Sequence, residues 1–478
     1  SRIGFVKNFV KIRVIRVGFT TFVLHSKKIK AVEIHLPIIL SKRSCAKQLI
    51  VLLTLFSCNE TPAPKKTMDA TQQLHQLHQK LTDIIITDIF TPPVASRIYA
   101  YTFLAAYEAG KFTQPNAPSI AASLKDFDAM PVPETGKTYD FQLASIKAFC
   151  AVAPKVIFST QEMAQLEQKN LSEWQKMLSD SVFKRSITFG EQVAAVIIKR
   201  LSNDNYKETR GMERYEVKNN ATGRWVPTPP DYADAVEPHW AKMKTFCLDS
   251  ASQFRPVPPP AYEVKKGSLF QKETQEVYDL SKSLTDNQMD IISFWDDNPF
   301  VSKHKGHLMF QDKKMTPGGH WLAICQLFLK QQKVGYYPTL RTYALTSIGI
   351  YEAFLSCWEA KYHYALLRPE TVISETIEKQ WHPYLVTPPF PAYTSGHSTI
   401  SAAAATILTN VFGDNQSFTD TTEVAYGLPI RSFKSFQEAA LEASESRILA
   451  GIHFRSDCVN GNQQGKKVGD WVLNRIKN

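Results

Sequence analysis

Cysteine pairs, long hydrophobic runs and internal repeats are all missing from this 478-residue chain. Five cysteines follow residue 58, widely spaced and without a CxxC pair, which excludes a zinc finger or a dense disulfide scaffold. No apolar run is long enough to predict a membrane-spanning helix. No segment alternates apolar and polar residues for long enough to predict a β-sheet. These absences leave a globular protein built from helices.

The chain also lacks a basic surface, although its formal net charge is +11. Eleven Lys and Arg residues but a single Glu fall within residues 1–57, which leaves a net charge of +1 for residues 58–478. Basic residues confined to a leader do not form a polyanion-binding surface, so we expect no nucleic-acid partner.

Residues 1–57 are predicted to be a leader and signal segment. Basic residues precede the short apolar run Leu49–Phe56, and Ser57 stands before Cys58. Leu55–Cys58 resembles a bacterial lipobox, in which Cys58 would be lipidated and become the mature N-terminus; an ordinary signal peptide with an incidental cysteine is the alternative. Residues 1–40 fit neither a signal nor a domain, and we interpret them as upstream sequence translated by mistake.

This leader predicts an exported bacterial protein. We expect it in the periplasm, or held at the outer membrane or cell surface by a lipid on Cys58, which would be its only membrane contact.

Apolar residues recur at three- and four-residue spacing through most of the chain, which predicts an all-α fold. Helices are expected in an N-terminal half, 58–220, within 75–90, 96–109, 141–153, 162–180 and 181–201. Residues 221–265 are rich in proline and are predicted to form an ordered crossing segment, since aromatics such as Phe246 can be buried. In the C-terminal half, 266–478, helices are expected at 273–284, 288–295, 320–332, 338–368, from 398, at about 434–450 and at about 464–476. Thr285–Gln288 reads as a capping box for the second of these.

The segment FPAYTSGHSTISAAAATIL (390–408) places Ser395, Gly396 and His397 at the predicted start of a helix of small residues. Free N–H groups and the positive end of the helix dipole suit such a position to an oxyanion. The Ser395 hydroxyl and the Gly396 N–H would add donors, and His397 could move protons. The alternative is that Thr394 or Ser395 only caps the helix and that His397 lies at the surface.

A second group consists of Lys361 and Arg368, followed by Pro369. Their separation of seven residues is about two helical turns, so we expect both on one face near the end of the helix at 338–368.

A third group lies in SRILAGIHFRSD (446–457). Gly451 predicts the end of the helix that carries Arg447. His453 then falls in a turn, where Asp457 can orient its imidazole. Asp296 or Asp297 is a candidate partner for Arg447.

Together these groups spell K-x6-R-P … S-G-H … S-R-x5-H-x3-D. This ordered set resembles the signature of the superfamily that joins vanadium-dependent haloperoxidases to type 2 phosphatidic acid phosphatases and bacterial acid phosphatases. The likeness is strongest over Tyr351–Asp457 and extends more loosely back to about residue 221. Thr394 stands where that superfamily usually has proline, which affects the stiffness of the loop more than its chemistry.

The resemblance implies two packed helical bundles of the vanadium haloperoxidase type and a vanadate cofactor that activates hydrogen peroxide toward halide. His453 would supply the apical nitrogen to vanadium, and His397 would be the acid–base. Trp358 and Phe390 match aromatic positions beside the vanadate pocket, with Asp457 supporting His453. The oxyanion would be bound by Lys361, Arg368, Ser395, Gly396 and Arg447.

Elementary electrostatics agrees with this assignment. Three cations within ~6 Å of one another repel by about 3 kcal/mol per pair at an effective dielectric constant near 20. Such a cluster is reasonable only around a multivalent anion, for which arginine supplies planar forks and lysine a point charge.

The function predicted is the oxidation of bromide or iodide, and chloride as a further candidate, with hydrogen peroxide. One alternative is an acid phosphatase that acts through a phosphohistidine, since phosphate and vanadate are both tetrahedral. Another is a non-catalytic lipoprotein that binds an oxyanion or a glycan, but such a protein would need neither His397 nor His453.

Overall fold

The computed structural model describes residues 69–217, 222–299, 302–305, 308–311 and 314–476. Residues 67–478 cluster into one compact unit. The leader, with Cys58, lies outside the described residues.

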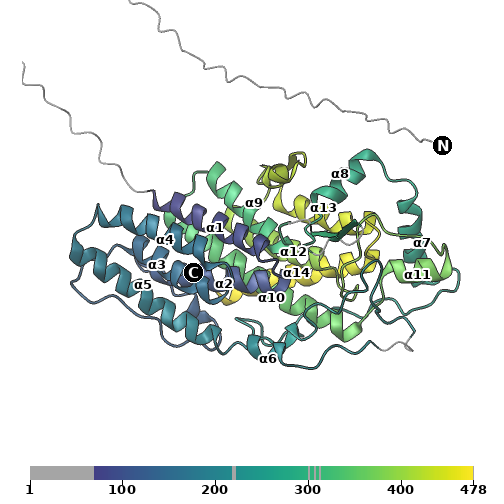
Figure 1. Ribbon diagram of the computed structural model, residues 1–478, viewed down its shortest axis with the longest axis horizontal. Coiled ribbons are helices and arrows are strands. Elements are labelled where there is room, and N and C mark those ends of the chain that lie inside the picture. The colour runs from purple at the N-terminus through teal and green to yellow at the C-terminus, as the bar shows by residue number, and fades with distance from the viewer. Residues whose placement is uncertain (1–68, 218–221, 300–301, 306–307, 312–313, 477–478) are drawn as a thin grey trace, which may run out of the picture. The chain divides into compact units, whose positions relative to one another are not determined.

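The described part of the chain is helical, as predicted (Figure 1). In its N-terminal half the helices are α1 (Ala70–Thr87), α2 (Pro92–Gly110), α3 (Phe141–Val152), α4 (Thr160–Gln175), α5 (Asp180–Leu201) and α6 (Tyr206–Arg210). They continue as α7 (Leu269–Ser281), α8 (Asp286–Phe294), α9 (Pro317–Gln331), α10 (Tyr336–Tyr364) and α11 (Pro369–Thr376). The last three are α12 (Gly396–Phe412), α13 (Phe436–Leu449) and α14 (Arg455–Arg475).

Short 3₁₀ helices and two small hairpins complete the described structure. The 3₁₀ helices are η1 (Lys111–Thr113), η2 (Ala121–Ser123), η3 (Ala153–Lys155), η4 (Trp240–Lys242) and η5 (Thr422–Tyr426). Strand β1 (Ser302–Lys305) pairs antiparallel with β2 (Leu308–Gln311), and β3 (Phe418–Asp420) pairs antiparallel with β4 (Arg431–Phe433).

Helix α10 lies at the centre of the core. It packs against α2, α12 and α14, while α2 packs in turn against α3 and α5. Of its 29 residues, 22 are buried, which explains why its apolar residues surround the helix instead of forming a stripe. One hydrophobic core therefore runs continuously from the N-terminal helices to α14.

The proline-rich crossing segment is ordered, as its aromatics predicted. Trp225, Trp240 and Phe246 are all at most 1% exposed. The backbone N–H of Trp225 donates to the Ala365 carbonyl over 2.7 Å, which ties the segment to the end of α10.

The predicted end of the long helix at Arg368 is wrong. Helix α10 ends at Tyr364, and Ala365 adopts a left-handed conformation with φ of +48°. Pro369 forces the residue before it into an extended conformation, so Arg368 is the N-cap of α11 and Pro369 its first residue. Arg368 consequently shares no helix face with Lys361.

The last helix also differs from expectation, because α14 begins at Arg455 and not near residue 464. The capping box over Thr285–Gln288 is confirmed at the start of α8.

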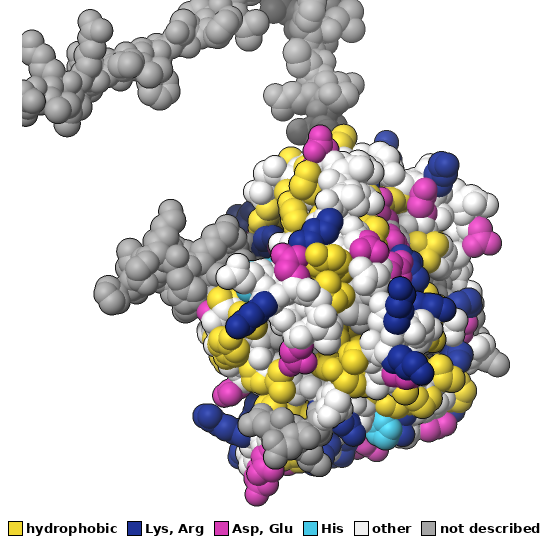
Figure 2. Space-filling view, turned by 90° about the vertical axis from the view of Figure 1, so that its right-hand side faces the viewer, with side chains coloured by type: hydrophobic (Ala, Val, Ile, Leu, Met, Phe, Trp, Pro, Cys, Tyr) yellow, Lys and Arg dark blue, Asp and Glu magenta, His cyan; other side chains and the backbone are white. Residues whose placement is uncertain are grey.

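Among the described residues no helix has both the length and the apolar character that a bilayer crossing requires. On the face shown in Figure 2, Lys and Arg side chains are interspersed with Asp and Glu, in line with the near-zero net charge after the leader.

Candidate active site

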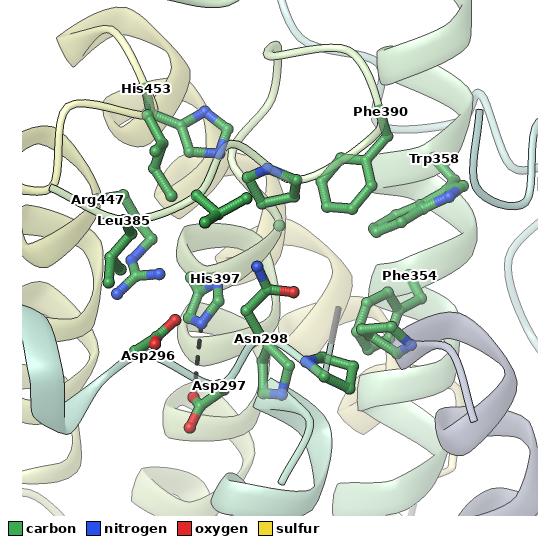
Figure 3. Close-up of a pocket in the computed structure, with 17 residues that line it drawn as sticks. Asp296, Asp297, Asn298, Phe354, Trp358, Leu385, Phe390, His397, Arg447 and His453 are labelled. Atoms are coloured by element: carbon green, nitrogen blue, oxygen red, sulfur yellow. Dashed lines mark ion pairs between the residues drawn. The ribbon is translucent and has the colours of Figure 1, made fainter. Parts of the chain in front are cut away.

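One pocket is lined by several of the predicted site residues. Its lining includes Trp358, Gly396, His397, Arg447 and His453, which come from α10, α12, α13 and the turn after α13 (Figure 3). Lys361, Arg368 and Ser395 are buried immediately behind that lining, with 0% exposure each.

His453 is held from both sides of its ring. Its Nδ1 lies 3.0 Å from Asp457 Oδ2, and its Nε2 lies 3.1 Å from Nη1 of Arg368. The carboxylate holds the proton on Nδ1, which leaves the lone pair of Nε2 directed toward the cations. Gly451, with φ of +80°, provides the left-handed turn that releases His453 from α13. The predicted contact between Asp457 and His453 is therefore present.

Backbone carbonyls hold the three cations in place. Lys361 Nζ donates to the carbonyls of Pro391 and Ala392 at 2.8 and 3.0 Å. Arg368 donates to those of Phe390, Ile452 and Pro388, at 2.8, 2.7 and 3.3 Å. Arg447 Nη2 donates to the Trp295 carbonyl at 2.6 Å, and its Nε to Ser446 Oγ at 2.9 Å.

Within the described residues, none of these three cations forms an ion pair. The expected pairing of Arg447 with Asp296 or Asp297 is thus wrong: Asp296 pairs with Lys314 at 2.5 Å, and both carboxylates act on Arg447 only through longer-range attraction. Burial lowers the pKa of Lys361 to about 7 and that of Arg368 to about 10. The pKa of His453 lies well below its usual value because of burial and then because of the neighbouring cations. The pocket therefore carries positive charge that no ion pair within the described residues neutralises.

The N-terminus of α12 faces this charge. Ser395 is its N-cap, and the Ser395 Oγ accepts from the Ser398 N–H at 3.3 Å. The capping role and the oxyanion role are compatible, because a hydroxyl that accepts one hydrogen bond can still donate another. Gly396 lines the pocket at the positive end of the helix dipole.

Helix α14 holds the loop before α12, in which Thr394 stands where the superfamily usually has proline. Thr394 Oγ1 donates to Gln464 Oε1 over 2.6 Å. Gln464 Nε2 donates to the carbonyl and hydroxyl of Ser356, both at 2.9 Å, on α10. A network of hydrogen bonds therefore stiffens the loop at Thr394.

His397 is the most accessible of the polar groups, with 15% of its side chain exposed. Its Nε2 lies 3.5 Å from Asp297 Oδ2, the contact drawn as a dashed line in Figure 3. Burial and the positive charge of Arg447 lower the pKa of His397 to about 4, and Asp297 acts in the opposite direction. His397 is therefore neutral near pH 7 in the ligand-free pocket.

Aromatic side chains form the opposite wall. The rings of Trp358 and Phe390 lie 5.0 Å apart, and Lys361 Nζ lies 4.9 Å from the Phe390 ring centroid. Trp358 Nε1 donates to the Val236 carbonyl at 3.2 Å, so the crossing segment fixes the indole. The predicted aromatic pair thus limits access of water to the cations.

These residues fit a tetrahedral oxyanion of charge two or three. Three buried cations without an ion-pair partner among the described residues, a helix N-terminus and an imidazole nitrogen that now accepts from Arg368 lie in or directly behind this pocket. An anion bound there would supply the charge that the protein itself does not provide.

Comparison with solved structures identifies the fold and the family. A crystal structure described as the first bacterial vanadium-dependent iodoperoxidase matches with 44% identity and a TM-score of 0.81, over 86% of this chain and 98% of the other. The chain belongs to the bacterial vanadium-dependent haloperoxidase family. Residues 341–478 also match the family model of the VCPO second helical-bundle domain.

More distant haloperoxidases share the fold. The holo and apo structures of a bacterial vanadium-dependent chloroperoxidase match with 17% identity each and TM-scores of 0.64 and 0.62. Both alignments cover 81% of this chain, and they cover 93% and 94% of the other chains. None of the curated proteins matches the sequence at a significant level.

Sequence reasoning missed several buried groups behind His397. His320, Asp420 and Glu423 were not predicted, and Asp297 was predicted only as a partner for Arg447. The segments TPGGHW and FWDDNP that carry His320 and Asp297 had no distinctive spacing relative to the SGH motif. The packing of α9 against α12, of η5 against α9 and of α8 against α13 brings them together.

Proposed function

We propose that the chain oxidises iodide and bromide with hydrogen peroxide, using vanadate held by the Lys361–Arg368–Arg447 cluster. Membership of its family makes it a vanadate-dependent haloperoxidase, and the choice of halide is the part that we propose. The observation that supports the binding site is the set of three buried cations without acidic partners beside the Nε2 of His453. The 44% identical iodoperoxidase supports iodide as the first halide to test.

The protein's contribution is to hold and polarise the cofactor. Bound vanadate supplies a Lewis-acidic centre that activates peroxide toward attack by a halide ion. Asp457 keeps His453 in the tautomer that offers Nε2. The three cations would hold the oxyanion and stabilise its negative charge.

His397 is suited to proton transfer on the accessible side. Its Nε2 faces Asp297, so in the neutral tautomer with the proton on Nε2, the lone pair on Nδ1 is free to accept a proton. Negative charge in the pocket raises the pKa of His397 from its ligand-free value of about 4 toward the range useful for acid–base catalysis.

The decisive experiment starts from protein freed of phosphate and reconstituted with orthovanadate. Halogenation of a phenolic acceptor with peroxide and iodide or bromide is the expected result. Absence of that turnover together with rapid cleavage of an aryl phosphate would establish a phosphatase instead. Absence of activity in both assays, together with tight saccharide binding, would establish a binding protein.

We further propose that Cys58 carries a lipid that anchors the mature protein at a bacterial membrane surface, with the folded unit in the periplasm or outside the cell. The basic and apolar leader and the Leu55–Cys58 lipobox support this. In a bacterial host, full-length protein is expected to partition into detergent and Cys58→Ala to be released from the membrane fraction. Equal release of both forms would contradict the anchor.

A further inference from the structure

Behind His397 lies a buried chain of alternating carboxylates and imidazoles. Asp297 Oδ2 lies 3.5 Å from His397 Nε2, and Asp297 Oδ1 lies 2.9 Å from Nδ1 of His320. The other ring nitrogen of His320, Nε2, lies 3.2 Å from Asp420 Oδ2. Asp297, His320 and Asp420 are at most 3% exposed.

Asp297, His320 and Asp420 each lie on or next to a different helix or strand. Asp297 follows α8, and His320 lies in the first turns of α9 with Trp295 stacked on its ring at 4.8 Å. Asp420 ends β3, and its Oδ1 accepts from the backbone N–H and the hydroxyl of Thr422 at 2.8 and 2.7 Å. His320 cannot rotate without losing a carboxylate contact at one of its nitrogens.

Two carboxylates at the two ring nitrogens require His320 to donate from both, and only the imidazolium ion can do so. Although burial opposes it, attraction to Asp297 and then to Asp420 raises the pKa of His320 well above its usual value. Burial would raise the pKa of Asp297, but His320 and then His397 hold it below the ordinary range. Asp297 is thus ionised inside the protein because His320 is charged.

The other charged groups around Asp297, His320 and Asp420 do not change the conclusion that His320 is charged and Asp297 ionised. Glu423 Oε1, from η5, lies 3.9 Å from His320 Nδ1 and has no hydrogen-bond partner, and burial raises the pKa of Glu423 to about 7. Lys314 neutralises Asp296 at 2.5 Å. Arg447, from α13, acts on His397 from the pocket side.

We propose that His320 is a positioning residue for His397. Clamped between Asp297 and Asp420, it keeps Asp297 charged and directed at His397 Nε2, so that His397 turns its Nδ1 lone pair toward the pocket and can hold a proton there. This inference rests on the proposed haloperoxidase function for its role in turnover, but the positioning itself is testable without catalysis.

The test compares wild type with His320→Gln, whose amide keeps a hydrogen-bonding group without the charge. The pKa of His397 is read by NMR of ¹³C-labelled histidine in vanadate-free protein saturated with inorganic phosphate, its signal assigned by its absence in His397→Gln. Loss of the imidazolium removes a positive charge that itself lowers the pKa of His397, but it also lets Asp297, which lies nearer, take up a proton. The pKa of His397 should therefore fall. In the vanadate-loaded enzyme, kcat should fall about tenfold or more, the acidic limb of its pH profile should move to lower pH, and vanadate should be retained.

Two further variants keep the proposal testable if His320→Gln folds poorly. Asp420→Asn should move the pKa of His397 in the same direction by a smaller amount. Asp297→Asn should lower the pKa of His397 at least as far as His320→Gln, because His320 and its charge remain. Adding His320→Gln to it should lower that pKa no further. His78→Gln is the matched control. This histidine is also 0% exposed and forms a hydrogen bond with a side chain, that of Gln326, but it lies on α1 and outside the group formed by Asp297, His320 and Asp420. It should leave the pKa of His397 unchanged.

An unchanged pKa of His397 in His320→Gln would overturn the proposal. So would elemental analysis showing one divalent metal ion per wild-type chain that is lost in His320→Gln, since Asp297, His320 and Glu423 would then hold a metal ion in place of the proton. A wild type without peroxidase turnover but with the expected NMR shift would contradict the proposed function while supporting the positioning role.

Discussion

At the scale of single residues, the two histidines of the pocket are in different electrostatic surroundings. His453 is 3% exposed and has a carboxylate on Nδ1 and a guanidinium on Nε2, whereas His397 is partly exposed and has one carboxylate contact. The first arrangement suits a fixed ligand and the second a group that exchanges protons.

This difference predicts that alanine substitution of the two histidines impairs different properties of the enzyme. His453→Ala should abolish vanadate retention, because the nitrogen donor is removed. His397→Ala should retain vanadate but lower kcat by about 10²- to 10⁴-fold, the usual contribution of an acid–base group. Vanadium content after gel filtration and steady-state kinetics give the two readouts. His382→Ala, at a side chain 68% exposed, is the control expected to change neither. The reverse pattern would mean that the two roles are exchanged.

Lys361 predicts a pH dependence of anion binding. Burial lowers its pKa to about 7 in the ligand-free pocket, so above pH 7 the lysine is neutral and must regain a proton when an anion binds. The affinity for inorganic phosphate should therefore fall as pH rises from 7, by at most tenfold per pH unit for this one proton. Calorimetry on wild type and Lys361→Met separates this effect from titration of phosphate itself. Identical pH slopes in the two proteins would rule it out.

The sequence predicted the cation cluster and both histidines but not the groups behind His397. The cations and histidines could be predicted because they occur at fixed spacing in three ordered motifs. Asp297, His320 and Asp420, in contrast, are separated by up to 123 positions, and single acidic residues in loops carry no spacing signal. Their role follows only from distances in the folded chain.

At the scale of helices, α14 positions the N-terminus of α12. Gly461, Gly465 and Gly469 recur every four residues on the face of α14 that packs against α12. A Cβ at Gly465 would lie 2.0 Å from the carbonyl oxygen of Thr399, one turn into the helix that begins at Gly396. Residues 455–463 at the start of α14 were missed in the sequence because a polar run that contains Gly461 is a poor helix former. That glycine, like Gly465 and Gly469, is needed for close packing.

Gly465→Ala should therefore destabilise the protein by about 3 kcal/mol, at the upper end of overpacking effects, because the contacted atom is backbone. The start of α12 should shift with it, so vanadate retention should weaken in protein that still folds. Urea unfolding and vanadium content measure both effects. At Gly335 nothing lies within 4 Å of an added Cβ, and Gly335→Ala should cost less than about 1 kcal/mol. Equal stability of the two variants would contradict the packing argument.

At the scale of the whole folded unit, α10 joins the parts that the sequence suggested were separate. The periodicity predicted the helices and the prolines predicted the crossing segment. The large core that the N-terminal and C-terminal helices share could not be predicted, because it depends on which faces of distant helices meet. Helix α10 also carries Lys361, so the stability of this core and the geometry of the pocket are connected.

The crossing segment is attached to α10 by Glu352, whose removal gives a last prediction. Glu352 is 0% exposed and accepts hydrogen bonds from the backbone N–H groups of Phe246, Cys247 and Leu248. Glu352→Ala leaves these donors buried without a partner, so the free energy of unfolding at pH 5 should fall by about 3 kcal/mol. Glu359→Ala, seven residues further along α10, removes only a partly exposed ion pair with Arg255 and should cost less than about 1 kcal/mol.

The pH dependence of that difference tests the cause. Burial raises the pKa of Glu352 to about 7, so its contribution is complete below the unfolded-state value near 4.5 and is lost as pH rises through 7. The difference in unfolding free energy between wild type and Glu352→Ala should therefore narrow between pH 5 and pH 8 in urea unfolding experiments. A gap for Glu352→Ala that widened with pH would mean that the ionised carboxylate is the form that holds the crossing segment on α10.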